Sequence, residues 1–268
     1  MKIIDALKIL FGNPVAVIKD GIRAQRENYF KKKLLNQYDI NELPTIDLLD
    51  LFPNFNESLH SYSFLNGTSL ITDIMLLKSF ARKFNNCAYL EIGSWKGESI
   101  ANVADIAEEC ISINLSSAEM RDLDYAEDVI QLHGIFSNKI KNITHIEHNS
   151  LTFDFNTLGK LFDLFFVDGD HTYEAVKSDS KNVFNLRKDE KSIIVWHDYG
   201  FHTESVRYSV LKGILDGIPK AFHHNLYHLS NTMCAVYIEN VQLQTYFTKF
   251  PTYPNKEFNI QMEATRLK

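Results

Sequence analysis

The stretch from Leu90 to Ser99, which reads LEIGSWKGES, constrains the fold more than any other part of the chain. An apolar run ends at Glu91 and turns through two glycines, Gly93 and Gly97. The segment after the turn carries apolar residues at helical spacing, namely Ile100, Val103, Ala104 and Ala107. This pattern predicts a strand, a tight glycine turn and a helix, which together form the building unit of parallel α/β sheets.

The two glycines bring the backbone close to any molecule bound beyond the end of the strand. Gly93 can adopt a positive φ and Gly97 lets the start of the helix pack closely, so that N–H groups face the crevice. Such a crevice suits a nucleoside cofactor that carries an anionic group. The dinucleotide-binding pattern G-x-G-x-x-G is not met, because Trp95 stands at the second glycine position. A turn that serves only to pack the strand against the helix is the alternative interpretation.

From Cys87 onward, strand-like and helix-like segments alternate. This alternation predicts a parallel sheet with right-handed crossover connections. We expect strands near residues 87–92, 110–114, 143–148, 162–168 and 191–196. Two later segments, 221–228 and 233–239, have only Leu229 to Thr232 between them, which is too short for a helical crossover. These two segments should therefore pair antiparallel.

The composition is that of an ordinary globular protein, with 45% hydrophobic and 23% charged residues among 268. The formal net charge of −6 argues against a nucleic-acid binder, which normally carries a basic face. Cys87, Cys110 and Cys234 are too few and too scattered for a disulfide framework or a zinc site. No stretch reaches the roughly 18 apolar residues of a membrane span, so we expect a cytoplasmic protein without a transmembrane segment.

Polar side chains follow the fourth and fifth expected strands. The run FDLFFV before Asp168 is continuously apolar, as in a buried central strand, so Asp168 should project into the same crevice as Gly93. The next strand, IIVW, ends in His197 and Asp198. Two carboxylates and one imidazole can bind a divalent cation, either Mg²⁺ or, because of the histidine, Mn²⁺. A hydrogen-bonded polar cluster without a metal is the alternative.

Three motifs carry a resemblance to a known family. LEIGSWKGES, FDLFFVDGDHTYEAVKS and IIVWHDYG, in this order, resemble class I S-adenosylmethionine-dependent methyltransferases over roughly Cys87 to Glu239. More narrowly, they are similar to methyltransferase family 24, which is related to metal-dependent sugar and catechol O-methyltransferases. The resemblance implies an α/β fold with a Rossmann-like, mostly parallel sheet, a reversed antiparallel last strand and helices on both faces.

The resemblance also implies which residues bind S-adenosylmethionine. The methionine and ribose part would be lined by Glu91, Gly93, Ser94, Trp95 and Gly97. Asn114 stands where the family usually has an acidic residue on the ribose hydroxyls, and Asn149 with Ser150 stands at the adenine position. An amide cannot supply the charge-assisted hydrogen bond of a carboxylate, so these departures predict weaker cofactor binding.

The same resemblance assigns catalytic and metal-binding roles. The ligand positions of the metal-dependent relatives correspond to Asp168, His197 and Asp198, with Asp168 also counted as catalytic. His171 stands where catechol-type enzymes place a lysine base, and an imidazole suits removal of a hydroxyl proton near neutral pH. A histidine bonded to backbone at the start of a helix is the alternative for His171.

The chain is expected to have three parts. Residues 1–85 should form an N-terminal helical extension that is helical to about residue 35 and irregular over 36–66. Residues 86–240 should form the methyltransferase domain. Residues 241–268 should form a tail over the surface or over a partner subunit, which is compatible with a homo-oligomer. By the resemblance, the extension helps to close the cofactor site, and Gly67 to Ser69 is either part of that lid or an ordinary helix cap.

Basic residues cluster in the extension at Arg23, Arg26 and Lys31 to Lys33. They form a solvated helix face, or they attract a membrane surface or an anionic substrate carrier.

The expected function is therefore methylation of a hydroxyl on a sugar or other small metabolite, with S-adenosylmethionine as methyl donor and Mg²⁺ or Mn²⁺ assisting. Two alternatives stay open. Asp168-Gly169-Asp170 also fits the Asp-x-Asp motif of a metal-dependent nucleotide-sugar glycosyltransferase. The amides at Asn114 and Asn149 are compatible with a non-catalytic binding protein that retains the fold.

Overall fold

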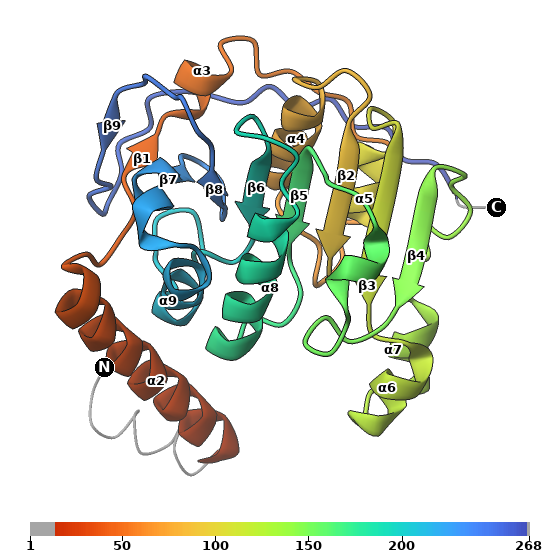
Figure 1. Ribbon diagram of the computed structural model, residues 1–268, viewed down its shortest axis with the longest axis horizontal. Coiled ribbons are helices and arrows are strands. Elements are labelled where there is room, and N and C mark those ends of the chain that lie inside the picture. The colour runs from red at the N-terminus through yellow and green to blue at the C-terminus, as the bar shows by residue number, and fades with distance from the viewer. Residues whose placement is uncertain (1–13, 267–268) are drawn as a thin grey trace.

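The computed structural model describes residues 14–266, and within them one sheet of nine strands has helices on both faces (Figure 1). Along the sheet the order is β4-β3-β2-β5-β6-β8-β7-β1-β9. The strands are β1 (Thr45–Ile46), β2 (Ala88–Ile92), β3 (Glu109–Asn114), β4 (Ile143–Glu147), β5 (Leu164–Val167), β6 (Ile193–Trp196), β7 (Leu226–Leu229), β8 (Ala235–Tyr237) and β9 (Thr245–Tyr246). The helices are α2 (Pro14–Tyr38), α3 (Leu48–Leu51), α4 (Ile71–Ala81), α5 (Glu98–Val103), α6 (Ser117–Asp122), α7 (Glu127–Gln131), α8 (Tyr173–Asn185) and α9 (Tyr208–Gly217), with 3-10 helices η1 (Phe155–Leu158) and η2 (Lys220–Asn225).

Strands β4, β3, β2, β5 and β6 are mutually parallel, as the alternation of strands and helices predicts. At the centre, Ile92 of β2 pairs with Ile113 of β3 on one side and with Val167 of β5 on the other. The carboxyl ends of these strands therefore lie at one edge of the sheet, where α/β proteins bind their ligands. The five predicted strands begin and end within two residues of the observed ones.

The reversed strand is β8, which lies between β6 and β7 and runs antiparallel to both. Its position confirms the predicted fold class. The expected strand over 221–228 is wrong in its first half, because residues 220–225 form η2 and β7 begins at Leu226. Pro219 fixes the entry into this 3-10 segment, and a ring nitrogen of His223 lies 2.9 Å from the carbonyl oxygen of Ile218.

Two short strands extend the sheet beyond the segments that were expected to form it. β1 is parallel to β7, with Thr45 opposite His228, and β9 is antiparallel to β1, with Thr45 opposite Tyr246. Each contains two residues, which is too short to leave a periodic pattern in the sequence. The tail after β9 lies on the chain's own surface, where Nζ of Lys256 is 2.7 Å from Oδ2 of Asp47.

Side chains alternate along β5 and β6, and they build a separate core on each face of the sheet. Phe165 and Trp196 belong to a cluster with residues of α2, α8 and α9, whereas Phe166 and Val195 belong to a cluster with residues of α4 and α5. All four side chains are fully buried. A strand that is covered on both faces needs a continuous apolar run, which explains the lack of polar alternation in FDLFFV and IIVW.

Helix α2 is the described part of the predicted N-terminal helix, and the helix expected before Pro14 lies outside the described residues. It lies along α9 (Figure 1), where Glu27 accepts hydrogen bonds from the backbone and, at 2.7 Å, from the hydroxyl of Ser209. The ring of Phe30 lies 5.1 Å from that of Tyr173 on α8. None of the described helices combines the length and the apolar character needed to cross a membrane.

Candidate active site

The glycine turn after β2 allows three backbone segments to approach closely. Gly93 has a φ of 86°, and a Cβ at this position would overlap the carbonyl oxygen of Asp168. Gly97 has a φ of 84°, and a Cβ there would overlap the hydroxyl of Ser137 in the loop before β4. Only glycine fits both the conformation and the space, so these two residues let the turn after β2 approach the end of β5 and the loop that precedes β4.

Asp168, His197 and Asp198 lie together at the carboxyl ends of β5 and β6. Nδ1 of His197 is 2.9 Å from Oδ1 of Asp168 and 3.3 Å from Oδ2 of Asp198. One ligand-type atom from each residue lies within 4.8 Å of the other two. The sequence placed these side chains at the ends of two neighbouring strands, and the structure brings them together. Their role as metal ligands stays a prediction.

A third carboxylate, which the sequence does not predict, belongs to this cluster. Asp73, in the first turn of α4, is completely buried, and its Oδ2 lies 3.0 Å from Nε2 of His197. Oδ1 of Asp73 accepts a hydrogen bond from the backbone N–H of Met233. An acidic residue in the first turn of a helix is common because it complements the helix dipole, so the sequence gives no signal that Asp73 belongs to a site.

The three carboxylates determine the charge of the cluster. Burial disfavours a charged imidazole, but Asp168, Asp198 and Asp73 together raise the pKa of His197 well above its usual range. Burial also opposes ionisation of Asp198, but His197, with further help from His171 and Arg207, lowers the pKa of Asp198 to about 2. In the absence of a cation, the cluster therefore holds a proton on the ring of His197 and a charge on Asp198.

The donor set fits a divalent cation. Two carboxylates and one ring nitrogen face the same point, and Asp73 accepts from the opposite ring nitrogen of His197, as carboxylates do behind metal-bound histidines. A cation and a proton would compete for Nδ1 of His197, because both use the same lone pair. Oxygen ligands favour Mg²⁺ and the imidazole favours Mn²⁺, so the residues do not distinguish the two ions.

His171 lies beside this cluster on the loop between β5 and α8. Its Nε2 is 3.0 Å from Oδ2 of Asp198, and 34% of its side chain is exposed, so a bound molecule can reach the ring. The backbone-bonded alternative finds no support among the described residues: the cap of α8 is Thr172, whose hydroxyl accepts from the N–H of Ala175. Asp198 therefore orients an accessible imidazole next to Asp168.

Asp170 does not join the cluster, although it lies only two residues from Asp168. Its two oxygens accept hydrogen bonds from the N–H and the hydroxyl of Thr172, at 3.0 and 3.1 Å. The segment Asp168-Gly169-Asp170 thus presents one carboxylate to the crevice and uses the other to shape the loop. This arrangement argues against the Asp-x-Asp glycosyltransferase alternative.

Glu91, predicted to line the cofactor, has no exposed surface. Its carboxyl accepts hydrogen bonds from the hydroxyls of Ser99, at 2.7 Å, and Tyr89. Burial raises the pKa of Glu91 to about 7, against the opposing effect of the hydroxyl donors around it. The side chain supports the glycine turn from its buried side. Its contact with a cofactor stays a prediction.

The amide side chains of Asn114 and Asn149, which were expected to contact the cofactor, accept hydrogen bonds from nearby backbone groups. Oδ1 of Asn114, at the end of β3, accepts the N–H of Ser94 at 2.6 Å, which fixes one side of the glycine turn. Oδ1 of Asn149 accepts the N–H of Leu151 at 3.0 Å in the loop after β4, next to Ser150. Both side chains lie at the expected edge of the sheet, and their contacts with ribose and adenine stay predictions.

Residues 63–68 lie over the glycine turn. A Cβ on Gly67 would be 3.0 Å from the indole nitrogen of Trp95, so the indole packs directly on this glycine. The hydroxyl of Thr68 donates to Oε2 of Glu98 at 2.7 Å. The N-cap of α4 is Leu70, so Gly67 to Ser69 is not the helix cap, and a role as a lid stays a prediction.

A buried carboxyl lies beneath the loops that follow β4 and β5. Asp179 of α8 is 1% exposed, and neither of its oxygens forms a hydrogen bond within residues 14–266. A Cβ on Gly169 would be 3.8 Å from Oδ2 of Asp179. Burial raises the pKa of Asp179 to about 7; the Ser150 hydroxyl opposes this shift and the charge of Asp170 adds to it. Asp179 is therefore protonated in the folded protein at mildly acidic pH.

This shift predicts how an Asp179→Asn variant compares with the wild type. In the unfolded chain an aspartate titrates near pH 4, about three pH units below Asp179 in the fold. The contribution of Asp179 to stability is therefore complete below pH 4 and is lost as the pH rises through 7. Asparagine does not ionise, so only the wild type loses this stability as the pH rises. Between pH 5 and pH 8 the unfolding free energy of the variant should therefore rise relative to that of the wild type by about 2 to 3 kcal/mol.

Urea unfolding of both proteins at pH 5 and pH 8 measures this difference. Asp122→Asn, which changes an exposed acid on α6, is the matched control and should behave like the wild type at both pH values. An Asp179→Asn effect that is equal at pH 5 and pH 8 would contradict the assignment.

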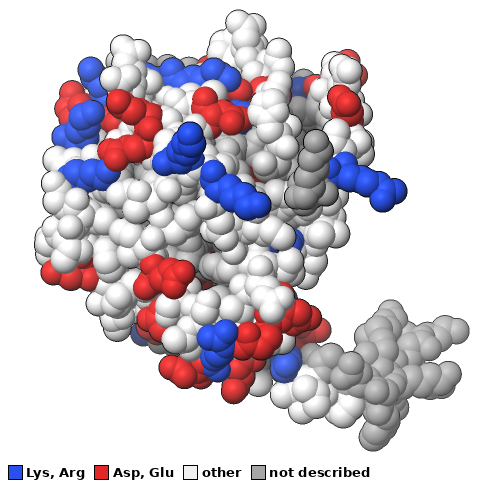
Figure 2. Space-filling model, turned by 90° about the vertical axis from the view of Figure 1, so that its right-hand side faces the viewer, with Lys and Arg blue, Asp and Glu red and all other residues white. Residues whose placement is uncertain are grey.

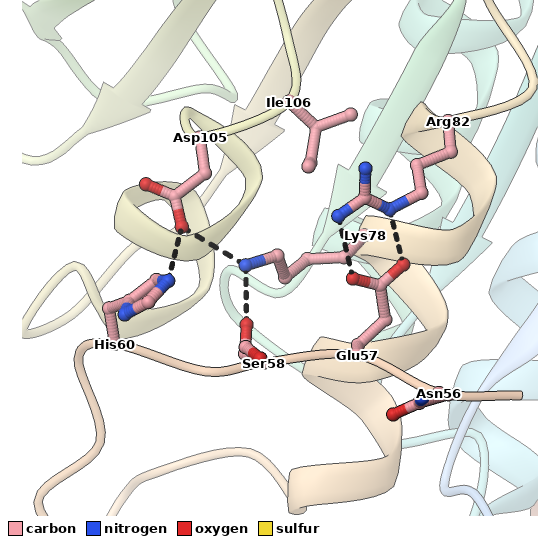
Figure 3. Close-up of a pocket in the computed structure, with 8 residues that line it drawn as sticks. All are labelled: Asn56, Glu57, Ser58, His60, Lys78, Arg82, Asp105 and Ile106. Carbon is pink, nitrogen blue, oxygen red and sulfur yellow. Dashed lines mark hydrogen bonds and ion pairs between the residues drawn. The ribbon is translucent and has the colours of Figure 1, made fainter.

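A cavity of about 390 Å³ lies away from the candidate site, at the end of α4 opposite to Asp73 (Figure 3). Its charged side chains pair with one another. Nζ of Lys78 is 3.0 Å from Oδ2 of Asp105, and Nε of Arg82 is 2.7 Å from Oε1 of Glu57. These mutual ion pairs account for the charges, so the cavity gives no indication of a ligand.

Comparison with known proteins identifies a related domain. Residues 90–199, from the glycine turn to just beyond the His197–Asp198 pair, match the model of a family described as a methyltransferase domain. Among curated proteins, no sequence matches this chain.

Several solved structures are similar to the chain at low sequence identity. Cofactor-bound Rv0187 from MTB is 16% identical, with 65% of this chain and 82% of that chain covered and a TM-score of 0.48. The O-methyltransferase TomG from Streptomyces achromogenes is 13% identical, with 63% and 79% covered and a TM-score of 0.45. CalS11, a TDP-rhamnose 3'-O-methyltransferase of calicheamicin biosynthesis, is 13% identical, with 64% and 80% covered and a TM-score of 0.43. Similarities of this strength leave the activity to be argued from the residues of this chain.

Proposed function

We propose that the protein transfers the methyl group of S-adenosylmethionine to a hydroxyl of a small acceptor, a sugar or related metabolite, because residues 90–199 match the model of a methyltransferase domain. The observation that carries the proposal is the cluster of Asp168, His197, Asp198 and His171, which lies at the strand ends directly beside the glycine turn. A cofactor at the turn and an acceptor at the cluster would be neighbours, as methyl transfer requires.

Each residue of the cluster has a separate task in this reaction. His171 takes the proton of the acceptor hydroxyl, since its ring is accessible and can be oriented by Asp198. Asp168 and His197 position the hydroxyl, and Asp73 fixes the ring of His197 from the buried side. As the proton leaves, the acceptor oxygen bonds to the methyl carbon and the bond from that carbon to sulfur breaks.

The products are a methyl ether, S-adenosylhomocysteine and a proton on His171. Holding the hydroxyl and the methyl carbon in line is the main contribution of the protein to such a step. Asp168, His197 and Asp198 would hold Mg²⁺ or Mn²⁺, and a bound cation lowers the pKa of a hydroxyl that it contacts.

Titration calorimetry of the full chain with S-adenosylhomocysteine tests the cofactor assignment. We expect binding with a dissociation constant in the micromolar range, about −8 kcal/mol. The variant Gly93→Val should abolish this binding, because its side chain would collide with the backbone at Asp168. Gly21→Val is the matched control, because a Cβ at Gly21 meets no atom within 4 Å.

The same titration separates the alternatives. UDP-glucose that binds in place of S-adenosylhomocysteine would support a glycosyltransferase and contradict the proposal. The absence of binding to either ligand would support a binding protein without transferase activity.

A further inference from the structure

A second group of charged side chains lies beside the cluster of Asp168, His197 and Asp198. Nη1 of Arg207 is 3.5 Å from Oδ1 of Asp198, and its guanidinium lies 5.1 Å from the centroid of the Phe201 ring. Arg23 of α2 lies over the same ring at 4.6 Å. One aromatic ring thus holds two guanidinium groups from separate parts of the chain next to the candidate site.

Arg207 is incompletely paired for a buried cation. Only 12% of its side chain is exposed, and its Nε has no hydrogen-bond partner in the described part of the chain. The 3.5 Å contact with Asp198 is longer than a charge-assisted hydrogen bond of about 2.7–2.9 Å. Buried charges in proteins are paired, so an anion would complete the environment of this guanidinium.

The carboxylates near Arg207 are already engaged by other partners. Asp198 contacts His171 at 3.0 Å and His197 at 3.3 Å. Glu27 accepts two hydrogen bonds from Ser209, at 2.7 and 3.2 Å. These contacts leave Nε of Arg207 without a hydrogen-bond partner in the described part of the chain.

The other end of the same sheet edge has the opposite charge. Figure 2 shows acidic side chains gathered over the part of the surface formed by α6 and α7. The exposed acids there are Asp122, Asp124, Glu127 and Asp128. A ligand with a negative group would therefore be repelled from the α6–α7 end and attracted to the α2 end, where Arg23, Arg26 and Arg207 lie.

We propose that Arg207, together with Arg23 and Arg26, binds an anionic group, phosphate or carboxylate, that the methyl acceptor carries near the hydroxyl to be methylated. The proposal rests on the proposed function and names its substrate class, a phosphorylated or carboxylated small molecule. The planar fork of arginine matches two oxygens of either group. An acceptor anchored in this way has its anion on the α2 side and its hydroxyl toward Asp168 and His171.

Titration calorimetry with three probes tests the proposal on the full chain. Inorganic pyrophosphate represents the phosphate group, citrate the carboxylate group, and glucose a neutral sugar. We expect one of the two anions to bind at millimolar or lower concentration, and the tighter one identifies the group. Arg207→Gln should weaken its binding about tenfold or more, and Arg23→Gln by a smaller factor.

Arg121→Gln is the matched control, because Arg121 is an exposed arginine of α6 paired with Glu127. It should bind the anion as the wild type does. The proposal is overturned if neither anion binds to the wild type, or if Arg207→Gln binds like Arg121→Gln. If circular dichroism shows that Arg207→Gln does not fold, the exposed Arg23→Gln decides, and unchanged binding in that variant overturns the proposal.

Titration with S-adenosylhomocysteine in the same samples separates this inference from the proposed function. Binding of S-adenosylhomocysteine without binding of either anion overturns only the anion site. Arginine-dependent binding of an anion without binding of S-adenosylhomocysteine retains the anion site and overturns the methyltransferase reaction.

Discussion

Asparagine in place of Asp168 is expected to weaken the binding of Mn²⁺ at least about tenfold and to lower the rate of methyl transfer at least about a hundredfold. The substitution keeps the size of the side chain but removes the charge that lies 2.9 Å from Nδ1 of His197. A cation would lose one of its two carboxylate ligands, and the acceptor hydroxyl would lose a positioning group. Calorimetry with MnCl₂ and the release of S-adenosylhomocysteine measure the two effects.

Asp170→Asn is the matched control for this experiment. It changes an aspartate in the same loop whose oxygens are turned to Thr172, so Mn²⁺ binding and methyl transfer should stay within about threefold of the wild type. Equal losses in the two variants would contradict the role given to Asp168. If the wild type does not bind Mn²⁺ and Asp168→Asn still slows methyl transfer, Asp168 acts through His197 and the cation assignment is wrong.

The sequence predicts Asp168, His197 and Asp198 as neighbours because a simple rule connects them. Each follows a continuous apolar run, such a run indicates a strand buried on both faces, and the carboxyl ends of parallel strands share one edge. The same rule places Gly93 at this edge. The placement of these residues at one edge of a parallel sheet therefore follows from short-range patterns, whereas the Rossmann-like fold class and the ligand roles were expected from the resemblance to class I methyltransferases.

The residues that complete the cluster lie on elements to which this rule does not apply. Asp73 precedes His197 by 124 positions and contacts it from the first turn of α4. Arg207 follows β6 in a loop without a periodic pattern. Arg23 lies over the same Phe201 ring as Arg207 only because α2 packs along α9. Side chains of this kind are recognised once the tertiary packing is known, because their own sequence surroundings are ordinary.

Local backbone geometry explains why the role of an amide such as Asn114 is harder to predict from sequence than the position of Asp168 or His197. The resemblance places Asn114 at the ribose because it follows the second strand of the domain, and in the structure its Oδ1 accepts the N–H of Ser94. A short polar side chain next to a turn readily bonds nearby backbone groups, and the sequence pattern is the same in either case. The hydrogen bond to Ser94 also gives a physical reason for an amide at this position, since it holds the glycine turn.

Removal of the imidazole of His171 is expected to lower kcat by a factor of about 10² to 10⁴, the usual contribution of a general base. In His171→Ala the acceptor hydroxyl has no group that can take its proton, whereas Asp168, His197 and Asp198 keep their mutual contacts. The affinity for S-adenosylhomocysteine and the KM for the acceptor should therefore change little. Steady-state rates and calorimetry on the same preparation separate the effect on kcat from effects on binding.

His171→Lys distinguishes a base from a structural side chain. Lysine is the base at the corresponding place in the catechol-type enzymes that the sequence resembles, and it can also contact Asp198. We expect His171→Lys to recover at least about tenfold of the activity that alanine loses. His60→Ala, which removes an exposed histidine 3.7 Å from Asp105 at the cavity of Figure 3, should keep wild-type activity. If His171→Ala lowers both the melting temperature and kcat, and His171→Lys restores neither, then His171 only supports the loop. The proton of the acceptor hydroxyl must then leave by way of the cluster around His197.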